Sequence, residues 1–280
     1  MDINGIVRTT PNYNFHSHSE FCDGRAPIAE MAESAWRCGM EHYGVSPHSP
    51  VPIPSPCNMA AEQTDAYFTE MERVKEIYTV RMNLYTGMEI DFLSPDWGPH
   101  IDYFQNLTLE YRIGSVHFVP TQDGIPVDCD GKFERFADNL KRAYEGDLRY
   151  VVERYFEQVL TMLERGGFDI LGHADKIAAN AAGADAEIEN QGWYRALIED
   201  VARHAASAGV LVEINTKALE DKKRFFPARR WWEIFAAEGC RFVVNSDAHR
   251  PERITSGREE AFSELAKIEE EKKKADSVCY

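Results

Sequence analysis

Histidine and acidic residues recur in this sequence at the carboxyl ends of hydrophobic segments that resemble β-strands. Six of the nine histidines fall there: His16, His18, His48, His117, His173 and His249. Three carboxylates accompany them, namely Asp23, Glu89 and Asp247. Imidazole and carboxylate groups are the ligands that zinc, iron and manganese prefer in proteins. The pattern therefore predicts a site for divalent metal ions, assembled from segments that are far apart in the chain.

The spacing within these segments also suits metal binding. One residue separates His16 from His18, and alternate residues of a strand point the same way, so both rings can reach one ion. Asp247 and His249 repeat this spacing in the last such segment. A carboxylate can offer one oxygen to each of two ions, so Glu89 could bridge a pair.

Other kinds of catalytic site are less well supported by the sequence. It contains no G-x-S-x-G nucleophile motif and no phosphate-binding GxxxxGK[ST] loop. None of the six cysteines forms a CxxC pair, and Asp23 beside Cys22 would raise the pKa of that thiol rather than activate it. The three other histidines are expected to be structural or superficial: His42, His100 and His204.

Seven candidate strands would position the six histidines and three carboxylates named above, which we call the metal-type residues. They span residues 13–18, 42–48, 83–92, 111–119, 168–175, 210–216 and 241–249. Amphipathic helical patterns occupy several of the gaps, over about 27–39, 152–166, 193–207 and 228–238. Strands that alternate with helices indicate a parallel sheet. Because no dinucleotide-binding glycine pattern is present, we expect a closed or nearly closed TIM-barrel-like fold, whose strands all end at one rim.

Three stretches interrupt this alternation. Residues 50–56 contain four prolines and are predicted to be an extended loop. Residues 120–148 form a long insert after the fourth strand, and long loops at the active rim of a barrel often cover substrate. Residues 267–280 form a charged tail, predicted to be an exposed helix.

Length and charge restrict the classes of function. The 280 residues suit one α/β domain, so we interpret 1–280 as a single domain. A formal net charge of −16 argues against nucleic acid and anionic membranes as partners. The sequence has no apolar run long enough to span a membrane and no signal-peptide pattern, so a reduced, cytoplasmic protein is expected.

The order of the motifs resembles that of the polymerase-and-histidinol-phosphatase (PHP) superfamily, and within it the monofunctional histidinol-phosphate phosphatases. The motifs are N-F-H-S-H, P-H-S-P, G-M-E-I-D, G-S-V-H-F, G-H-A-D and N-S-D-A-H, and the resemblance covers about residues 12–262. It implies a distorted (β/α)7 barrel with a trinuclear metal site. The second motif departs from the family, because Pro47 stands where an acidic residue often precedes the histidine.

The resemblance also implies how the ligands are shared among three ions. The first would be held by His16, His18, Glu89 and Asp247; the second by Glu89, His117 and His173; and the third by Asp23, His48 and His249. Two or three divalent ions are thus expected, and zinc, iron and manganese fit the ligand types equally well.

The resemblance implies a metal-dependent phosphomonoesterase. Clustered cations neutralise phosphate oxygens and lower the pKa of a bound water. The resemblance implies that L-histidinol phosphate is hydrolysed to L-histidinol and phosphate, in histidine biosynthesis. Two alternatives stay open: a phosphoesterase for another small phosphorylated molecule, a nucleotide or phosphotyrosine, and a non-catalytic metal-binding regulatory module.

Further residues are candidates for roles around the metals. Glu89, His117 and Asp247 are expected to be catalytic, with Asp175 as a general acid or a partner of a ligand. Three cations could bind the phosphate, namely Lys176, Lys217 and Arg250. The amino group of histidinol phosphate would need an acid, and the insert offers Asp123, Asp128 and Asp130.

Overall fold

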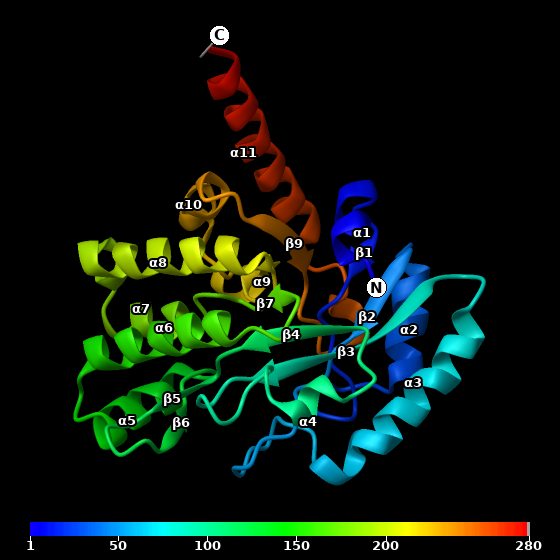
Figure 1. The fold of residues 1–280 in the computed structure, drawn as a ribbon, viewed down its shortest axis with the longest axis horizontal. Helices are drawn as coiled ribbons and strands as arrows, with labels where there is room; N and C mark the ends of the chain where they lie inside the picture. Colours follow the sequence, from blue (N-terminus) through cyan, green and yellow to red (C-terminus); the bar gives the residue numbers. More distant parts are fainter. Residues whose placement is uncertain (279–280) are drawn as a thin grey trace.

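Seven parallel strands form the centre of the protein in a computed structural model that describes residues 1–278 (Figure 1). Their order in the sheet follows the chain: β1 (Tyr13–Asn14), β2 (His42–Val45), β3 (Asn83–Asp91), β4 (Tyr111–Ser115), β7 (Ile170–Leu171), β8 (Leu211–Asn215) and β9 (Arg241–Asn245). All seven predicted strands are present, but most end several residues earlier than expected. Most of the metal-type residues therefore lie in the segments just after the strands.

The sheet curls into a nearly closed barrel. Residues just beyond β1 and β9 meet through a bridge between Ser17 and Ala248, where the His18 amide donates to the Ala248 carbonyl at 2.8 Å. The seam between β1 and β9 is also bridged by a side chain. The amide of Phe15, just after β1, donates to Asn245 Oδ1, on β9, at 2.9 Å. The predicted barrel is thus confirmed, with its first and last strands joined mainly at the carboxyl end.

Helices cover the outside of the barrel (Figure 1). They are α1 (Ile3–Thr9), α2 (Ile28–Arg37), α3 (Thr64–Tyr78), α4 (Asp102–Gln105), α5 (Phe133–Ala143), α6 (Leu148–Arg165), α7 (Ala178–Ala184), α8 (Gly192–Ala208), α9 (Leu219–Lys222), α10 (Trp232–Ala237) and α11 (Arg258–Val278). Four 3₁₀ turns are interspersed: η1 (Ala61–Gln63), η2 (Ile188–Asn190), η3 (Arg229–Trp231) and η4 (Pro251–Arg253). No helix in the described part of the chain is long and apolar enough to cross a membrane.

The four predicted helices correspond to α2, α6, α8 and the η3–α10 segment. Helix α6 illustrates why such a helix forms. The Asp147 side chain accepts a hydrogen bond from the Tyr150 amide at its start, Gly166 with φ 69° ends it, and Val152 and Phe156 lie on its buried face. Helix α3 was missed, although its buried Tyr67, Met71, Val74 and Tyr78 have helical spacing.

Two of the irregular stretches are structured. The region of the insert holds a hairpin of β5 (Phe118–Pro120) and β6 (Pro126–Asp128), followed by α5. The predicted tail helix is the distal part of α11, which projects from the body in Figure 1; the last two residues of that prediction, 279 and 280, lie outside the described residues.

The lower half of the barrel is filled by a hydrophobic cluster that includes Phe15, Tyr111 and Ile113. The Tyr111 side chain lies so close to Gly44 and Gly87 that a Cβ atom at either glycine would be 2.1 Å from it, from the hydroxyl oxygen at Gly44 and from the ring at Gly87. The Tyr111 hydroxyl donates to the Phe15 carbonyl at 2.6 Å. This closely packed layer of side chains fills the barrel beneath the carboxyl rim.

Candidate metal centre

The metal-type residues converge at the carboxyl rim of the barrel. Eight of the nine side chains are less than one fifth exposed, and Asp23 is 30% exposed. Glu89 lies at the centre. Its Oε2 atom is 3.1 Å from His16 Nε2 and 3.0 Å from His48 Nδ1, and its Oε1 atom is 2.8 Å from His173 Nε2. Each oxygen of this carboxylate thus faces a different set of imidazoles, as a bridging role requires.

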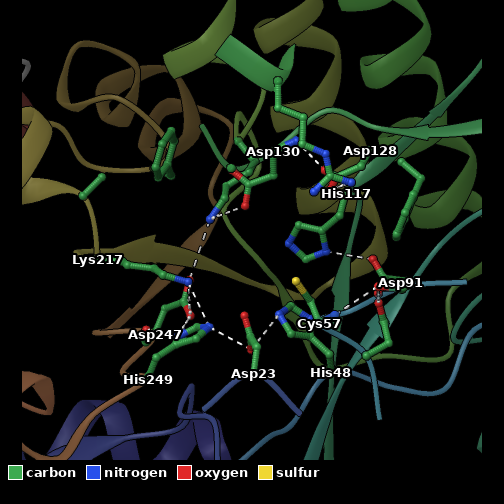
Figure 2. Close-up of a pocket in the computed structure, with 18 of the residues that line it drawn as sticks. Asp23, His48, Cys57, Asp91, His117, Asp128, Asp130, Lys217, Asp247 and His249 are labelled. Carbon is green, nitrogen blue, oxygen red and sulfur yellow. Dashed lines mark hydrogen bonds and ion pairs between the residues drawn. The ribbon is translucent and has the colours of Figure 1, made fainter. Parts of the chain in front are cut away.

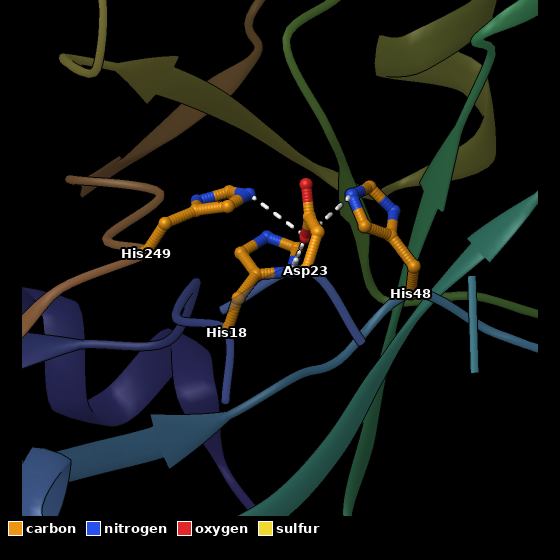
Figure 3. A group of neighbouring side chains, drawn as sticks. All are labelled: His18, Asp23, His48 and His249. Carbon is orange, nitrogen blue, oxygen red and sulfur yellow. Dashed lines mark ion pairs between the residues drawn. The ribbon is translucent and has the colours of Figure 1, made fainter. Parts of the chain in front are cut away.

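An outer group consists of Asp23 and the three histidines around it, His18, His48 and His249 (Figure 3). The Asp23 Oδ1 atom is 3.1 Å from His249 Nε2 and 3.8 Å from both His48 Nε2 and His18 Nδ1. One potential ligand atom from each of these residues lies within 4.8 Å of every other. The four groups could therefore surround a single cation.

Two inner groups have the same compactness. They consist of His16, His18 and Asp247, and of His48, Glu89 and His117. His173 adjoins the second group, because its Nε2 atom is 3.2 Å from His117 Nε2. The predicted division of ligands is thus only approximated: His18 and His48 each face two groups.

Buried atoms without partners show that the cluster suits cations. Within the nine residues at the rim, six ligand-type atoms are buried and lack a hydrogen-bond partner: His16 Nε2, His18 Nε2, Asp23 Oδ1, His48 Nδ1, Glu89 Oε2 and His173 Nδ1. All but the last point to neighbouring ligand groups at ion-pair distance. Since an unpaired buried polar atom is costly, divalent cations among these atoms would satisfy the site.

The electrostatics of the cluster are strongly coupled. Burial alone would raise the pKa of Glu89, but His16 and His48 hold that pKa well below its usual value. Burial would likewise lower the pKa of His16, but Glu213 and Glu89 raise it well above its usual value. Closely packed acids and bases of this kind are typical of functional sites. The backbone of Asp247 has φ 49°, a conformation that non-glycine residues usually adopt only where the surroundings enforce it.

Two carboxylates that the sequence analysis did not single out orient the imidazoles. Glu213, on β8, is fully buried and its Oε1 atom is 2.7 Å from His16 Nδ1. Asp91 Oδ1 is 2.7 Å from His117 Nδ1. Such contacts fix which ring nitrogen faces the metal. Both could have been found, since Asp91 follows Glu89 at a spacing of two and Glu213 interrupts an apolar strand.

The three predicted phosphate-binding cations line the pocket at the cluster, and Figure 2 shows Lys217 beside Asp247 and His249. Lys217 Nζ is 3.2 Å from both Asp247 Oδ1 and His249 Nε2. Lys176 is 5% exposed, and its Nζ atom is 3.8 Å from Asp247 Oδ2. Arg250 lines the same pocket at its rim, with its side chain 51% exposed.

Asp175 is placed differently from the prediction of a general acid. It is fully buried and does not line the pocket formed by the described residues. Its Oδ2 atom accepts a hydrogen bond from the Ala228 amide at 2.9 Å and lies 3.5 Å from Arg224 Nη2. The backbone after His173 turns this side chain away from the rim, so we withdraw the acid role and assign Asp175 to the packing of the loop before η3.

The three histidines predicted to be structural or superficial lie outside the cluster. His42 Nδ1 contacts the Tyr85 hydroxyl at 2.8 Å, at the start of β2 and therefore at the opposite rim. His100 Nε2 contacts the Pro95 carbonyl at 2.9 Å, and His204 lies on α8 with its side chain 39% exposed.

A nearly closed parallel barrel with buried histidines and carboxylates at its carboxyl rim defines a barrel protein that binds divalent metal ions. A comparison with family profiles agrees with this class, because the profile described as "PHP domain" matches residues 14–217. The chain belongs to the PHP domain family.

Individual relatives align with most of this chain. A protein of Schizosaccharomyces pombe named "Probable histidinol-phosphatase" is 25% identical over 256 residues, which cover 85% of this chain and 81% of the relative. A protein of Deinococcus radiodurans with the same name is 24% identical and is matched over 92% of its length, by 90% of this chain. Among solved structures, the histidinol phosphate phosphatase of Lactococcus lactis, in complex with zinc, L-histidinol and phosphate, has a TM-score of 0.71 at 19% identity. That match covers 92% of this chain and 94% of the other, and shows the same fold.

Proposed function

We propose that this protein is a metal-dependent phosphomonoesterase that hydrolyses L-histidinol phosphate to L-histidinol and phosphate. The observation that carries the proposal is the buried cluster of histidines and carboxylates with two lysines at its edge. The names of the relatives, which share most of their length with this chain, support the substrate. As a step of histidine biosynthesis, the reaction would take place in the cytoplasm.

The residues proposed to hold the metal ions are the nine that converge at the rim: His16, His18, Asp23, His48, Glu89, His117, His173, Asp247 and His249. We infer two or three divalent ions, because the side chains fall into an outer and two inner groups. Zinc is favoured by the Lactococcus lactis relative, which was solved with zinc. When bound, the ions would neutralise phosphate oxygens and lower the pKa of a coordinated water.

The remaining groups of the pocket would bind and orient the phosphate. The Lys217 and Lys176 ammonium groups lie near different oxygens of Asp247, at 3.2 and 3.8 Å, beside the space in which a phosphate at the metals would lie. Burial on its own would lower the pKa of Lys176, but Asp130 and Asp247 raise it, so this cation stays charged. Arg250 at the rim would attract the anion as it enters.

Steady-state kinetics on protein purified without chelators tests the proposal. We expect kcat/KM for L-histidinol phosphate to exceed that for nucleotides, phosphotyrosine and p-nitrophenyl phosphate, and elemental analysis to find at least two divalent ions per chain. A preference for nucleotides would overturn the substrate. Inactivity towards every phosphomonoester, with metals bound, would favour a non-catalytic module.

Substitution of the central carboxylate gives a second test. We expect Glu89→Gln to lower kcat at least about 100-fold while the far-ultraviolet circular dichroism stays unchanged, because the amide cannot balance the charge shared with several imidazoles. His117→Ala should behave in the same way. Wild-type activity in either variant would contradict the assignment of the site.

A further inference from the structure

The pocket above the metal cluster has room for more than a phosphate group. Its volume is about 640 Å³, within the range of ligand pockets. One side is formed by the metal-type residues and the lysines. The opposite wall is formed by the insert, which contributes Asp128 at the end of β6 and Asp130 just after it (Figure 2). A phosphorylated molecule with its phosphate at the metals would extend its organic part towards this wall.

The two acids on this wall differ in how well they are neutralised. Asp130 Oδ2 is 3.4 Å from Lys176 Nζ. Burial would raise the pKa of Asp130, but Lys176 and His117 hold it well below its usual value. This carboxylate is therefore already engaged in holding the buried lysine.

Asp128 is less well compensated. Its side chain is only 19% exposed, and its Oδ1 atom accepts a hydrogen bond from the Asp130 amide at 2.8 Å. Its cationic neighbour is Arg135, at 3.2 Å, whose side chain is 54% exposed. Burial raises the pKa of Asp128 in spite of that neighbour. A second cation placed against this carboxylate would offset its desolvation. Because Arg135 is exposed, its ion pair with Asp128 contributes little free energy and a ligand could replace it.

The hairpin also supplies an apolar surface beside the acid. In the pairing of β5 with β6, Phe118 is the direct partner of Asp128, and both residues line the pocket. Phe226 lines it as well. A ring and a carboxylate presented side by side suit a ligand that carries a planar heterocycle next to an ammonium group.

We propose that Asp128 is a specificity-determining residue that binds the ammonium group of the amino-alcohol phosphate, while the lysines and metals hold its phosphate. The inference rests on the proposed function and deepens it. It selects one of the three acids of the insert, because Asp130 is engaged by Lys176 and Asp123 is exposed and does not line the pocket among the described residues.

The test compares L-histidinol phosphate with its deamino analogue, 3-(imidazol-4-yl)propyl phosphate, on the metal-loaded protein. We expect Asp128→Asn to lower the ratio of kcat/KM for the two substrates about 10- to 100-fold, the effect of one lost charge-assisted hydrogen bond. The variant keeps an oxygen for the Asp130 amide. The matched control, Asp123→Asn, removes an exposed acid of the same hairpin and should keep the wild-type ratio.

A second variant separates substrate binding from a structural role. If Asp128 served only to pair with Arg135, then Arg135→Gln and Asp128→Asn would have the same effect. We expect Arg135→Gln instead to keep the preference for the amino substrate. The Asp128 carboxylate remains in this variant, and no arginine competes with the substrate's ammonium group for it.

The outcomes also separate this inference from the proposed function. An unchanged ratio in Asp128→Asn, an equal loss on both substrates, or matching behaviour of the two variants would overturn the inference and leave the proposed function intact. A wild-type protein that hydrolyses p-nitrophenyl phosphate but not histidinol phosphate would overturn the proposed substrate and, with it, the role of Asp128.

Discussion

At the scale of single residues, Glu213 shows how a side chain that binds no substrate can organise the site. Its carboxylate is fully buried, contacts His16 Nδ1 at 2.7 Å and accepts a hydrogen bond from the His173 amide at 3.0 Å. One acid thus orients groups on two different strand ends. Asn215 and Asn245 donate to the same carboxylate, which keeps it in place.

We expect Glu213→Gln to weaken metal binding about 10- to 100-fold, because Glu213 accepts through both oxygens whereas glutamine has one neutral acceptor, so His16 loses the charged partner that directs its other nitrogen to the metal. Competition with a chromophoric chelator measures the affinity without reference to activity. The exposed Glu238→Gln serves as the control. Unchanged affinity, accompanied only by lower stability, would make Glu213 a purely structural residue.

Asp175 carries a prediction about pH. Burial raises its pKa to about 6, with Arg224 opposing the shift, whereas an exposed aspartate titrates near about 3.9. Between these values the folded state holds a proton that the unfolded state has lost, so this group's stabilising contribution declines as the pH rises through about 6, by about 1.4 kcal/mol per pH unit.

An asparagine at this position carries no such proton. From pH 5 to pH 6 we therefore expect the free energy of unfolding of Asp175→Asn to rise by about 1 kcal/mol relative to the wild type, and the difference to level off above pH 7. Urea denaturation at several pH values measures it. A difference that does not depend on pH would show that Asp175 is ionised throughout.

At the scale of elements, the short strands explain why the metal-type residues can meet. Each strand brings the chain to the rim, and the segment after it can stay beside the neighbouring strand, as at His48, which forms a parallel bridge with Glu89. Most of the metal-type residues lie in these segments, where imidazoles from neighbouring strands can face one another. The hydrophobic cluster around Tyr111 packs beneath these segments, and the Tyr111 hydroxyl joins β4 to the chain after β1.

The seam of the barrel depends on a buried cation from α11. Arg258 is 4% exposed and donates to the carbonyls of Val244, on β9, and of Pro11, just before β1. Its guanidinium also lies 5.2 Å from the centre of the Tyr13 ring. This one side chain ties the C-terminal helix to both edges of the sheet.

We expect Arg258→Lys to lower the free energy of unfolding by about 2–4 kcal/mol, because lysine cannot reach both carbonyls or stack on the ring. Thermal and chemical denaturation measure the loss. Arg253→Lys, at a 41% exposed position in the neighbouring 3₁₀ turn, should be nearly neutral. Equal effects of the two substitutions would contradict the role given to the seam.

At the scale of the whole molecule, the metal cluster connects segments from nearly the entire chain. Its residues extend from His16 to His249 and follow six of the seven barrel strands or lie within them. The protein also has a net charge of −16, and the cluster concentrates three carboxylates in its interior. Bound cations would therefore both join the strands and relieve repulsion among the acids.

Removal of the metals should consequently destabilise the whole fold. We expect chelation to lower the melting temperature by roughly 5–15 °C, the size of effect produced when a tightly bound ligand is lost. Zinc or manganese added in excess should restore it, and the chelator preloaded with calcium serves as the control. If chelation removes the metals and the melting temperature stays the same, the bound cations do not contribute to the stability of the fold.

The order of strands, the barrel and the convergence of the metal-type residues at one rim could be predicted from the sequence alone. Hydrophobic periodicity marks each strand, and a histidine or acid at its end is visible without knowledge of the neighbours, as with His16 and Asp247. These features depend on local pattern, which a linear sequence displays directly.

The direction of individual side chains was decided by tertiary structure. Asp175 follows His173 by two positions, yet the chain turns it towards Arg224 and away from the pocket. Asp128 and Asp130 are only two positions apart, but of the two only Asp130 forms an ion pair with Lys176. Contacts of this kind join positions tens of residues apart, so no local pattern could reveal which acid remains available to a ligand.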